Sequence, residues 1–278
     1  MKSDGAHEYE LWSNIPPQLS FTEAEEKQGR EMLKALGIRN GEPFICFFAR
    51  DHSYLENALN FRTRREWSYH DYRDCSIENY LPAIEALADT GIWALRMGAV
   101  VKREVHSKST RIIDYASRFR SDFADVYLMS HCRYFVGDTS GINSISCIFG
   151  IPAVLLNMVP ISHLPRNRGD LFLPKMLWSI ESKRFMTLRE TIEIGADKWQ
   201  LSSLYKSAGI EVIQNTAEEI TAAVLEMEAR MNGTWKSTEE DEELQKLFWS
   251  IFPEGHPVKK CTSRIGADFL REHRDWLK

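Results

Sequence analysis

The sequence has few cysteines and no pair of them in a metal-binding or redox spacing. Its 278 residues include five cysteines, an odd number, which are widely spaced and form no C-x-x-C pair. A disulfide framework and a structural zinc site are therefore not expected. Reduced, scattered cysteines are typical of an intracellular protein, so we expect a cytoplasmic location.

Long apolar runs and an excess of positive charge are missing as well. No stretch approaches the roughly 18 apolar residues of a membrane-spanning helix, and the amino terminus does not read as a signal peptide. Asp and Glu outnumber Lys and Arg by 40 to 35, giving a net charge of -5. Nucleic acids are excluded as a general partner because they require a basic face, whereas a local anion site remains allowed.

Several catalytic signatures are also absent. The chain contains no P-loop, G-x-G-x-x-G, H-E-x-x-H or G-x-S-x-G motif, which argues against kinases, simple Rossmann oxidoreductases, zincins and α/β-hydrolases. The composition is otherwise that of a globular protein, with 43% hydrophobic and 27% charged residues.

Strand-length apolar runs alternate with helical patterns through the first two thirds of the chain. Alternation at this spacing predicts an α/β fold, with a Rossmann-like parallel sheet and helices on both faces. The expected strands are 44–48, 92–95, 111–115, 134–136 and 153–156, and the expected helices are 77–90, 122–130 and 142–149.

The two ends of the chain read as helical. Thr22 and Glu25 form a capping-box pattern at the start of a helix over 20–36. A helical tail is expected at 217–231, 241–252 and 266–276, and the segments 50–74 and 157–174 read as long polar loops. We therefore divide the chain into an extension with a helix, 1–40, and a Rossmann-like domain with carboxyl-terminal helices, 41–278.

Polar side chains directly follow two of the predicted strands. Ligands of an open parallel sheet bind outside the carboxyl ends of its strands, where an arginine can grip phosphate and a carboxylate or imidazole can act as a base. The alternative is a surface Arg–Asp pair, which contributes little. The candidates are Arg50, Asp51, His52 and Tyr54 after the first strand and Arg96 and Gly98 after the second.

The strongest local pattern is a strand that runs into a polar turn and then a helix. A helix start offers free N–H groups to an anion, and glycine allows a close approach, although plain capping explains the same residue types. The residues are Asp138, Thr139, Ser140, Gly141 and Asn143. Together with Arg50 and Arg96 they predict a diphosphate-sized anion site at one edge of the sheet.

Weaker candidates lie in the two long polar segments. They can add contacts to a ligand, or they can be capping residues and solvated loop charges. These residues are Tyr72, Arg73, Asp74, His163, Arg166, Asp170 and Lys175.

Seven short motifs in sequence resemble a family of bacterial glycosyltransferases associated with surface polysaccharide loci. They are FFARD at 47–51 with Tyr54, YRD at 72–74 with Tyr80, LRMG at 95–98, SDF at 121–123, GDTSG at 137–141, GIPAV at 150–154 and DLFLPK at 170–175. The resemblance covers roughly residues 35–278. It implies a nucleotide-sugar site on a Rossmann-like domain similar to the carboxyl-terminal half of a GT-B enzyme.

This resemblance implies transfer of a glycosyl group from a nucleotide-diphosphate sugar to a glycan or lipid-linked acceptor. Arg50 and Arg96 would neutralise the leaving diphosphate without a metal, and Asp51 or His52 would be the base of an inverting reaction. No cofactor is expected besides the donor itself. The implied substrate-binding residues are Arg96, Gly98, Tyr54, Tyr72, Arg73, Asp138, Thr139, Ser140, Gly141, Asn143 and Lys175.

One departure leaves an alternative open. A GT-B enzyme has two facing Rossmann-like domains, whereas only about 40 residues precede the first predicted strand here. The alternative is a non-catalytic module that binds a nucleotide-sugar or glycan and acts with a partner chain. Attachment to a membrane surface and assembly with a second copy or another subunit also remain open.

Overall fold

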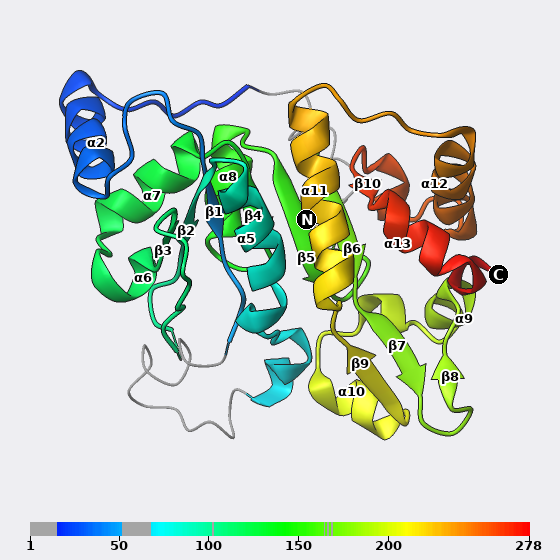
Figure 1. Ribbon diagram of the computed structural model, residues 1–278. Coiled ribbons are helices and arrows are strands. Elements are labelled where there is room, and N and C mark those ends of the chain that lie inside the picture. The colour runs from blue at the N-terminus through cyan, green and yellow to red at the C-terminus, as the bar shows by residue number, and fades with distance from the viewer. Residues whose placement is uncertain (1–15, 52–67, 102, 164, 166, 168) are drawn as a thin grey trace.

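A seven-stranded parallel sheet forms the centre of the molecule (Figure 1). The computed structural model describes residues 16–51, 68–101, 103–163, 165, 167 and 169–278. The strand order is β10-β6-β5-β4-β1-β2-β3, which contains the Rossmann order 3-2-1-4-5-6. The strands are β1 (Phe44–Phe47), β2 (Trp93–Arg96), β3 (Ile112–Ile113), β4 (Phe135–Gly137), β5 (Ala153–Met158), β6 (Leu171–Pro174) and β10 (Arg264–Ile265). The predicted Rossmann-like α/β fold is confirmed.

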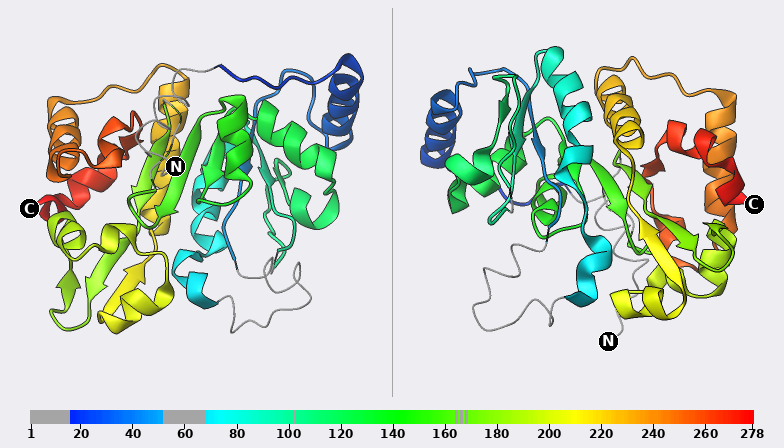
Figure 2. Two further views of the ribbon diagram at one scale, coloured as in Figure 1. Left: turned by 180° about the vertical axis from the view of Figure 1, so that it is seen from behind. Right: turned by 60° about the horizontal axis from the view of Figure 1, so that its bottom comes forward.

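Helices cover both faces of this sheet. In Figure 1 the helices α5 (Leu81–Asp89) and α11 (Ala217–Met231) lie on the face turned to the viewer. The view from behind in Figure 2 shows α7 (Asp122–His131) and α8 (Asn143–Phe149) on the opposite face. Strands buried on both sides read as continuous apolar runs, which is why the sequence pattern located them.

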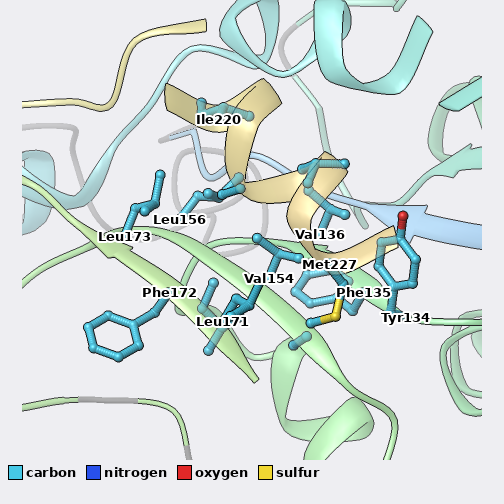
Figure 3. Close-up of a cluster of buried hydrophobic side chains, with 14 of the residues drawn as sticks. Tyr134, Phe135, Val136, Val154, Leu156, Leu171, Phe172, Leu173, Ile220 and Met227 are labelled. Atoms are coloured by element: carbon cyan, nitrogen blue, oxygen red, sulfur yellow. The ribbon is translucent and has the colours of Figure 1, made fainter. Parts of the chain in front are cut away.

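The core lies between α11 and strands β4, β5 and β6. Figure 3 shows Ile220 and Met227 of α11 directed toward Val136, Val154 and Leu156 of the sheet. All of these side chains are at most 1% exposed. Removing this much apolar surface from water is the main stabilising contribution to the fold.

The helix near the amino terminus begins with the expected cap. Helix α2 (Glu23–Ala35) starts at Thr22, whose side chain and Glu25 form a capping box. Thr216 caps α11 in the same way. The carboxyl-terminal region is helical, as predicted, with α12 (Glu239–Ile251), α13 (Ala267–Glu272) and η5 (Arg274–Leu277). The division of the chain at residue 40 stays a prediction.

Several predicted segments differ from the structure. The helix expected over 77–90 is η2 (Ile77–Asn79) followed by α5, and the strand expected over 111–115 is β3 followed by α6 (Tyr115–Arg118). The loop expected over 157–174 is wrong at both ends, because β5 continues to Met158 and β6 begins at Leu171. Short strands surrounded by polar residues give too weak a pattern to separate from loops.

A small antiparallel sheet, which no sequence pattern predicts, follows β6. Its order is β8-β7-β9. The elements are β7 (Met176–Ser179), β8 (Arg184–Phe185), α9 (Leu188–Glu193), η3 (Ala196–Lys198), α10 (Ser202–Ser207) and β9 (Ile210–Ile213). The right view of Figure 2 shows α10 beside η1 (Ser68–Arg73). The N–H of Tyr72 donates to Ser202 Oγ at 3.3 Å and joins the two elements. The small sheet thus flanks the carboxyl edge of the large one.

The described part of the chain contains no helix that is both long and apolar enough to cross a membrane.

Candidate functional site

The strand order of the large sheet reverses between β1 and β4, and the two candidate segments meet there. The chain leaves β1 toward Arg50 and leaves β4 toward Asp138. The backbone N–H of Arg50 donates to Asp138 Oδ2 at 2.5 Å. Open α/β sheets bind ligands at such a switch point, outside the carboxyl ends of the strands. We call this place the switch-point crevice.

Asp138 is a buried carboxylate within the crevice. Its side chain accepts hydrogen bonds from the Arg50 N–H and, at 3.0 Å, from the Cys75 thiol. Burial raises the pKa of Asp138 to about 6, although both hydrogen bonds and the nearby arginines oppose this rise. The other carboxylate oxygen, Oδ1, is buried and has no hydrogen-bond partner in the described residues.

Two arginines bring positive charge to the crevice. Arg73 donates to the backbone oxygen of Thr139 and, at 3.3 Å, to its hydroxyl. Burial lowers the pKa of Arg73, and the positive charge of Arg50 lowers it further. Arg50 Nε lies 3.5 Å from Asp74 Oδ1 and has no hydrogen-bond partner in the part of the chain that is described. The two guanidinium groups repel one another, and an anion between them would relieve this repulsion.

Lys175 holds the segment that carries Arg73. Its side chain is buried between β6 and β7, and Nζ donates to the backbone oxygens of Tyr72 at 2.9 Å and Asp74 at 2.6 Å. Burial lowers the pKa of Lys175, whereas Cys75, Asp138 and Asp74 raise it. The structure therefore makes Lys175 a positioning residue as well as a source of positive charge.

A cavity of about 340 Å³ adjoins the crevice on the side of β2. Its wall comes from the ends of β1, β2 and β9, from the turn between η1 and η2, and from the loop after β2. The lining residues are Ala49, Asp51, Asp74, Cys75, Ser76, Ile77, Glu78, Arg96, Arg103 and Gln214. We call it the β2-side cavity. Asp51, the proposed base, is in its wall.

Arg96 reaches this cavity, but its charge is already paired. Its side chain is buried, Nη1 lies 3.3 Å from Asp114 Oδ1, and it also donates to the Arg103 carbonyl at 2.7 Å. A diphosphate would have to compete with Asp114 for this guanidinium. Gly98 has φ of 147°, and a Cβ there would lie 2.7 Å from Val101 Cγ1. Backbone geometry thus explains this glycine without a ligand.

The turn between β4 and α8 differs from the expected helix start. The helix begins at Asn143, has no side-chain cap and spans seven residues. Residues 139–142 form a turn instead. Asn143 accepts from the hydroxyl of Ser146, Gly141 is exposed, and Ser140 Oγ is buried without a partner in the described residues. An anion at this turn would meet the Ser140 hydroxyl rather than a regular helix end.

The remaining candidates lie away from the crevice or outside the described residues. The ring of Tyr72 packs against the ring of Tyr205, with 5.3 Å between the ring centroids. It belongs to the hydrophobic cluster of the small sheet and not to the crevice. Asp170 is buried and accepts the N–H groups of Ala153 and Asn167. It therefore braces the start of β6. The ring of His163 contacts Gln200 instead, with 3.2 Å between His163 Nε2 and Gln200 Nε2. His52, Tyr54 and Arg166 lie outside the described residues.

Three further residues at the site, Cys75, Gln214 and Glu78, match no pattern that would mark them as site residues in the sequence. Cys75 links Asp138 to the buried Tyr80, whose hydroxyl is 3.6 Å from the Cys75 sulfur. Gln214 reaches the cavity from β9, and its Oε1 accepts the Ser76 N–H at 2.9 Å. Glu78 stands at the cavity rim. Only the tertiary fold brings these segments together, so no local spacing could have identified them.

In the part of the chain that the structure describes, no three His, Cys, Asp or Glu side chains lie close enough together to hold a metal ion. Independence from metal stays a prediction.

The fold and site define a Rossmann-like α/β protein with a polar crevice at its switch point. The sequence matches no protein-family model, and no curated protein is significantly similar to it. Among solved structures, the chain is similar to Thermosulfurimonas dismutans KpsC, a beta Kdo 2,4 transferase, with 13% identity and a TM-score of 0.28. The likeness covers 59% of this chain and 55% of that one. A likeness of this degree carries no functional argument.

Proposed function

We propose that this protein binds a nucleotide-diphosphate sugar in the switch-point crevice and transfers its glycosyl group to a glycan or lipid-linked acceptor. The observation that carries the proposal is the cluster of Arg50, Arg73 and Lys175 around Asp74 and Asp138. Three cations face two carboxylates, and burial favours the neutral form of one of them. A diphosphate has the charge and the acceptor oxygens to complete this site.

The chemistry that fits this arrangement is electrostatic stabilisation of a leaving diphosphate. In the proposed step, an acceptor hydroxyl attacks the anomeric carbon and gives its proton to Asp51. The bond from that carbon to the phosphate oxygen breaks, and the diphosphate leaves with the electron pair. Arg50 and Arg73 stabilise the charge that develops on it. The Arg73 guanidinium is held beforehand by Thr139, and the Arg50 guanidinium lies beside Asp74, so little reorganisation is needed.

A binding module that acts with a partner chain is the second candidate. The described residues contain one Rossmann-order sheet and a small antiparallel sheet, whereas the GT-B plan has two facing Rossmann-like domains. Such a module would keep the nucleotide-sugar site and lack turnover.

An assay of nucleotide release separates the two candidates. The purified protein would be incubated with UDP-, GDP- and CMP-sugars, with and without a panel of glycan acceptors. We expect release from a diphosphate donor, and a loss of about 100-fold in kcat/KM in Arg73→Met, as for removal of one donor to a developing charge. Arg30→Met changes an exposed arginine of α2 and is the matched control.

Three results are informative in this assay. Release that depends on Arg73 supports the transferase. Binding without release across all acceptors supports the module. Absence of both binding and release contradicts a nucleotide-sugar site altogether.

A further inference from the structure

Three buried polar atoms of the switch-point crevice have no hydrogen-bond partner in the described residues. They are Arg50 Nε, Asp138 Oδ1 and Ser140 Oγ. Buried polar groups are nearly always paired, so a cluster of unpaired ones indicates that a ligand or water completes it. A diphosphate would accept hydrogen bonds from the Arg50 N–H and the Ser140 hydroxyl. An ionised carboxylate can only accept, so Asp138 Oδ1 lacks the proton that a bond to the same anion requires.

The two oxygens of the Asp138 carboxyl group differ in their surroundings. Oδ2 accepts from the backbone N–H of Arg50 at 2.5 Å and from the Cys75 thiol at 3.0 Å. Burial and the neighbouring Asp138 raise the pKa of Cys75 well above its usual range, so the thiol keeps its proton and is the donor. Because both donors occupy Oδ2, a carboxyl proton belongs on Oδ1, the oxygen that no described donor contacts.

A chain of buried hydrogen bonds fixes the direction of these donors. Asn157 Nδ2 donates to the Tyr80 hydroxyl at 3.2 Å, and that hydroxyl lies 3.6 Å from the Cys75 sulfur. The Asn157 amide is held in this orientation because its Oδ1 accepts the N–H of Asn215 at 2.7 Å. Tyr80 therefore accepts from Asn157 and offers its own proton to Cys75, which leaves the thiol proton for Asp138.

The charge of Asp138 depends on the cations around it. Burial raises its pKa to about 6, and the charges of Arg50 and Arg73 oppose this rise. Near pH 7 the carboxyl group of the free protein is therefore mostly ionised. A diphosphate between the two arginines would neutralise them and add its own negative charge, and both changes favour the protonated acid. The other titratable groups around Asp138 are Asp74, which pairs with Arg50, and Cys75, Tyr80 and Lys175.

We propose that Asp138 takes up a proton from solvent when a diphosphate binds in the crevice, and that its Oδ1 donates this proton in a hydrogen bond to a phosphate oxygen. This inference rests on the proposed function. The proton returns to solvent when the diphosphate leaves. Because the complex holds one proton more than the free protein, affinity is highest below about pH 6 and falls as the pH rises above this value.

Asp138→Asn imitates the protonated acid and tests the inference. Its amide oxygen can accept from Arg50 and Cys75, and its NH₂ group is a donor in the place of Oδ1 at any pH. Calorimetric titration with UDP and GDP would compare it with wild type, so that protons bound by the nucleotide cancel. We expect similar affinities at about pH 5.5, and at least about tenfold tighter binding by Asp138→Asn at about pH 8. Asp275→Asn, the same change at an exposed carboxylate, should behave as wild type.

Two further comparisons separate the proton from the hydrogen bond. Calorimetry at about pH 7 in buffers of different ionisation enthalpy should show that wild type takes up about half a proton or more beyond Asp138→Asn. Asp138→Leu has a similar size and no donor, and it should bind UDP at least about tenfold more weakly than Asp138→Asn. Equal affinity of these two variants would overturn the hydrogen bond from Oδ1.

The remaining outcomes distinguish the inference from the proposed function. UDP or GDP binding with the same pH dependence in wild type and Asp138→Asn would overturn the inference and leave the diphosphate site intact. Weaker binding by folded Asp138→Asn than by wild type at about pH 8 would also overturn it, because the ionised carboxylate would then be the binding form. Absence of binding of either nucleotide to wild type would contradict the proposed function.

A measurement on wild type alone completes the test and does not depend on whether a variant folds. Carbon-13 NMR of labelled aspartate carboxyl groups, titrated with and without UDP, reports the pKa of Asp138 directly. We expect UDP to raise this pKa to about 7 or above. An unchanged pKa in the presence of bound UDP would overturn the inference.

Discussion

Asp138 follows β4 and accepts a hydrogen bond from the backbone that follows β1, so it links the two strands at the switch point. The charge of its carboxyl group depends on pH. Its pKa of about 6 in the folded protein exceeds the value of about 3.9 in an unfolded chain. The folded state therefore binds this proton more tightly. The stability that this residue contributes is complete below about pH 4 and is lost as the pH rises through 6.

The Asp138→Asn variant isolates this effect. The difference in unfolding free energy, wild type minus variant, should fall by about 2–3 kcal/mol between pH 4 and pH 7. Urea unfolding at several pH values measures it. Because every other titrating group is present in both proteins, a difference that stays constant over this range would contradict the burial of a titrating Asp138.

Arg96 illustrates how a residue expected to bind phosphate can be held by the protein itself. Arg96→Met should destabilise the fold by about 3–5 kcal/mol, because Asp114 would remain as a buried carboxylate without its cation. Arg118→Met is the control, since its ion pair with Glu104 is exposed, and it should cost less than about 1 kcal/mol.

Denaturant titrations of both variants distinguish the two roles of Arg96. If Arg96→Met is as stable as the control but binds diphosphate poorly, the guanidinium serves the ligand rather than the fold.

At the scale of elements, strand β4 ends in a glycine and the turn after it contains another, and the two glycines have different reasons for their presence. A Cβ on Gly137 would overlap the ring of Phe135 and lie 2.9 Å from the backbone oxygen of Phe48. A Cβ on Gly141 would meet nothing within 4 Å. Strand β4 can therefore lie against the end of β1 only if residue 137 has no side chain.

Alanine at each position tests this distinction. Gly137→Ala should lower stability by about 1–3 kcal/mol through overpacking, and Gly141→Ala should change it by less than about 0.5 kcal/mol. Thermal unfolding measures both. If Gly141→Ala proves the more damaging of the two, the described packing of this turn is incorrect.

Sequence patterns predicted the elements of the large sheet far better than those of the small one. The predicted strand 44–48 is one residue longer than β1, and the predicted strand 92–95 is shifted by one residue from β2. Both were found because buried parallel strands are continuous apolar runs. Strand β8 has two exposed residues, and such a short pattern carries no periodicity. The capping box at Thr22 was visible because its two residues, Thr22 and Glu25, are three positions apart.

For the whole molecule, the rule for carboxyl ends of parallel strands predicted part of the site. This rule predicted that Arg50 and Asp138 lie at the same edge of the large sheet, although 88 positions separate them in the sequence. It could not show that Asp114 neutralises Arg96, or that Cys75 and Gln214 enter the site. Those contacts depend on how η1, η2 and the small sheet pack against the large sheet, which no local pattern encodes.

The central claim is that the switch-point crevice is a diphosphate site, and calorimetric titration with UDP and GDP tests it most directly. We predict that wild type and Arg30→Met bind at least one of them equally well, and that Arg73→Met binds it about 10- to 100-fold more weakly, as expected for a charged hydrogen bond. Arg73→Lys should retain part of the affinity, and circular dichroism should show all variants folded. Equal affinity in folded wild type and Arg73→Met, or no binding to wild type, would contradict the claim.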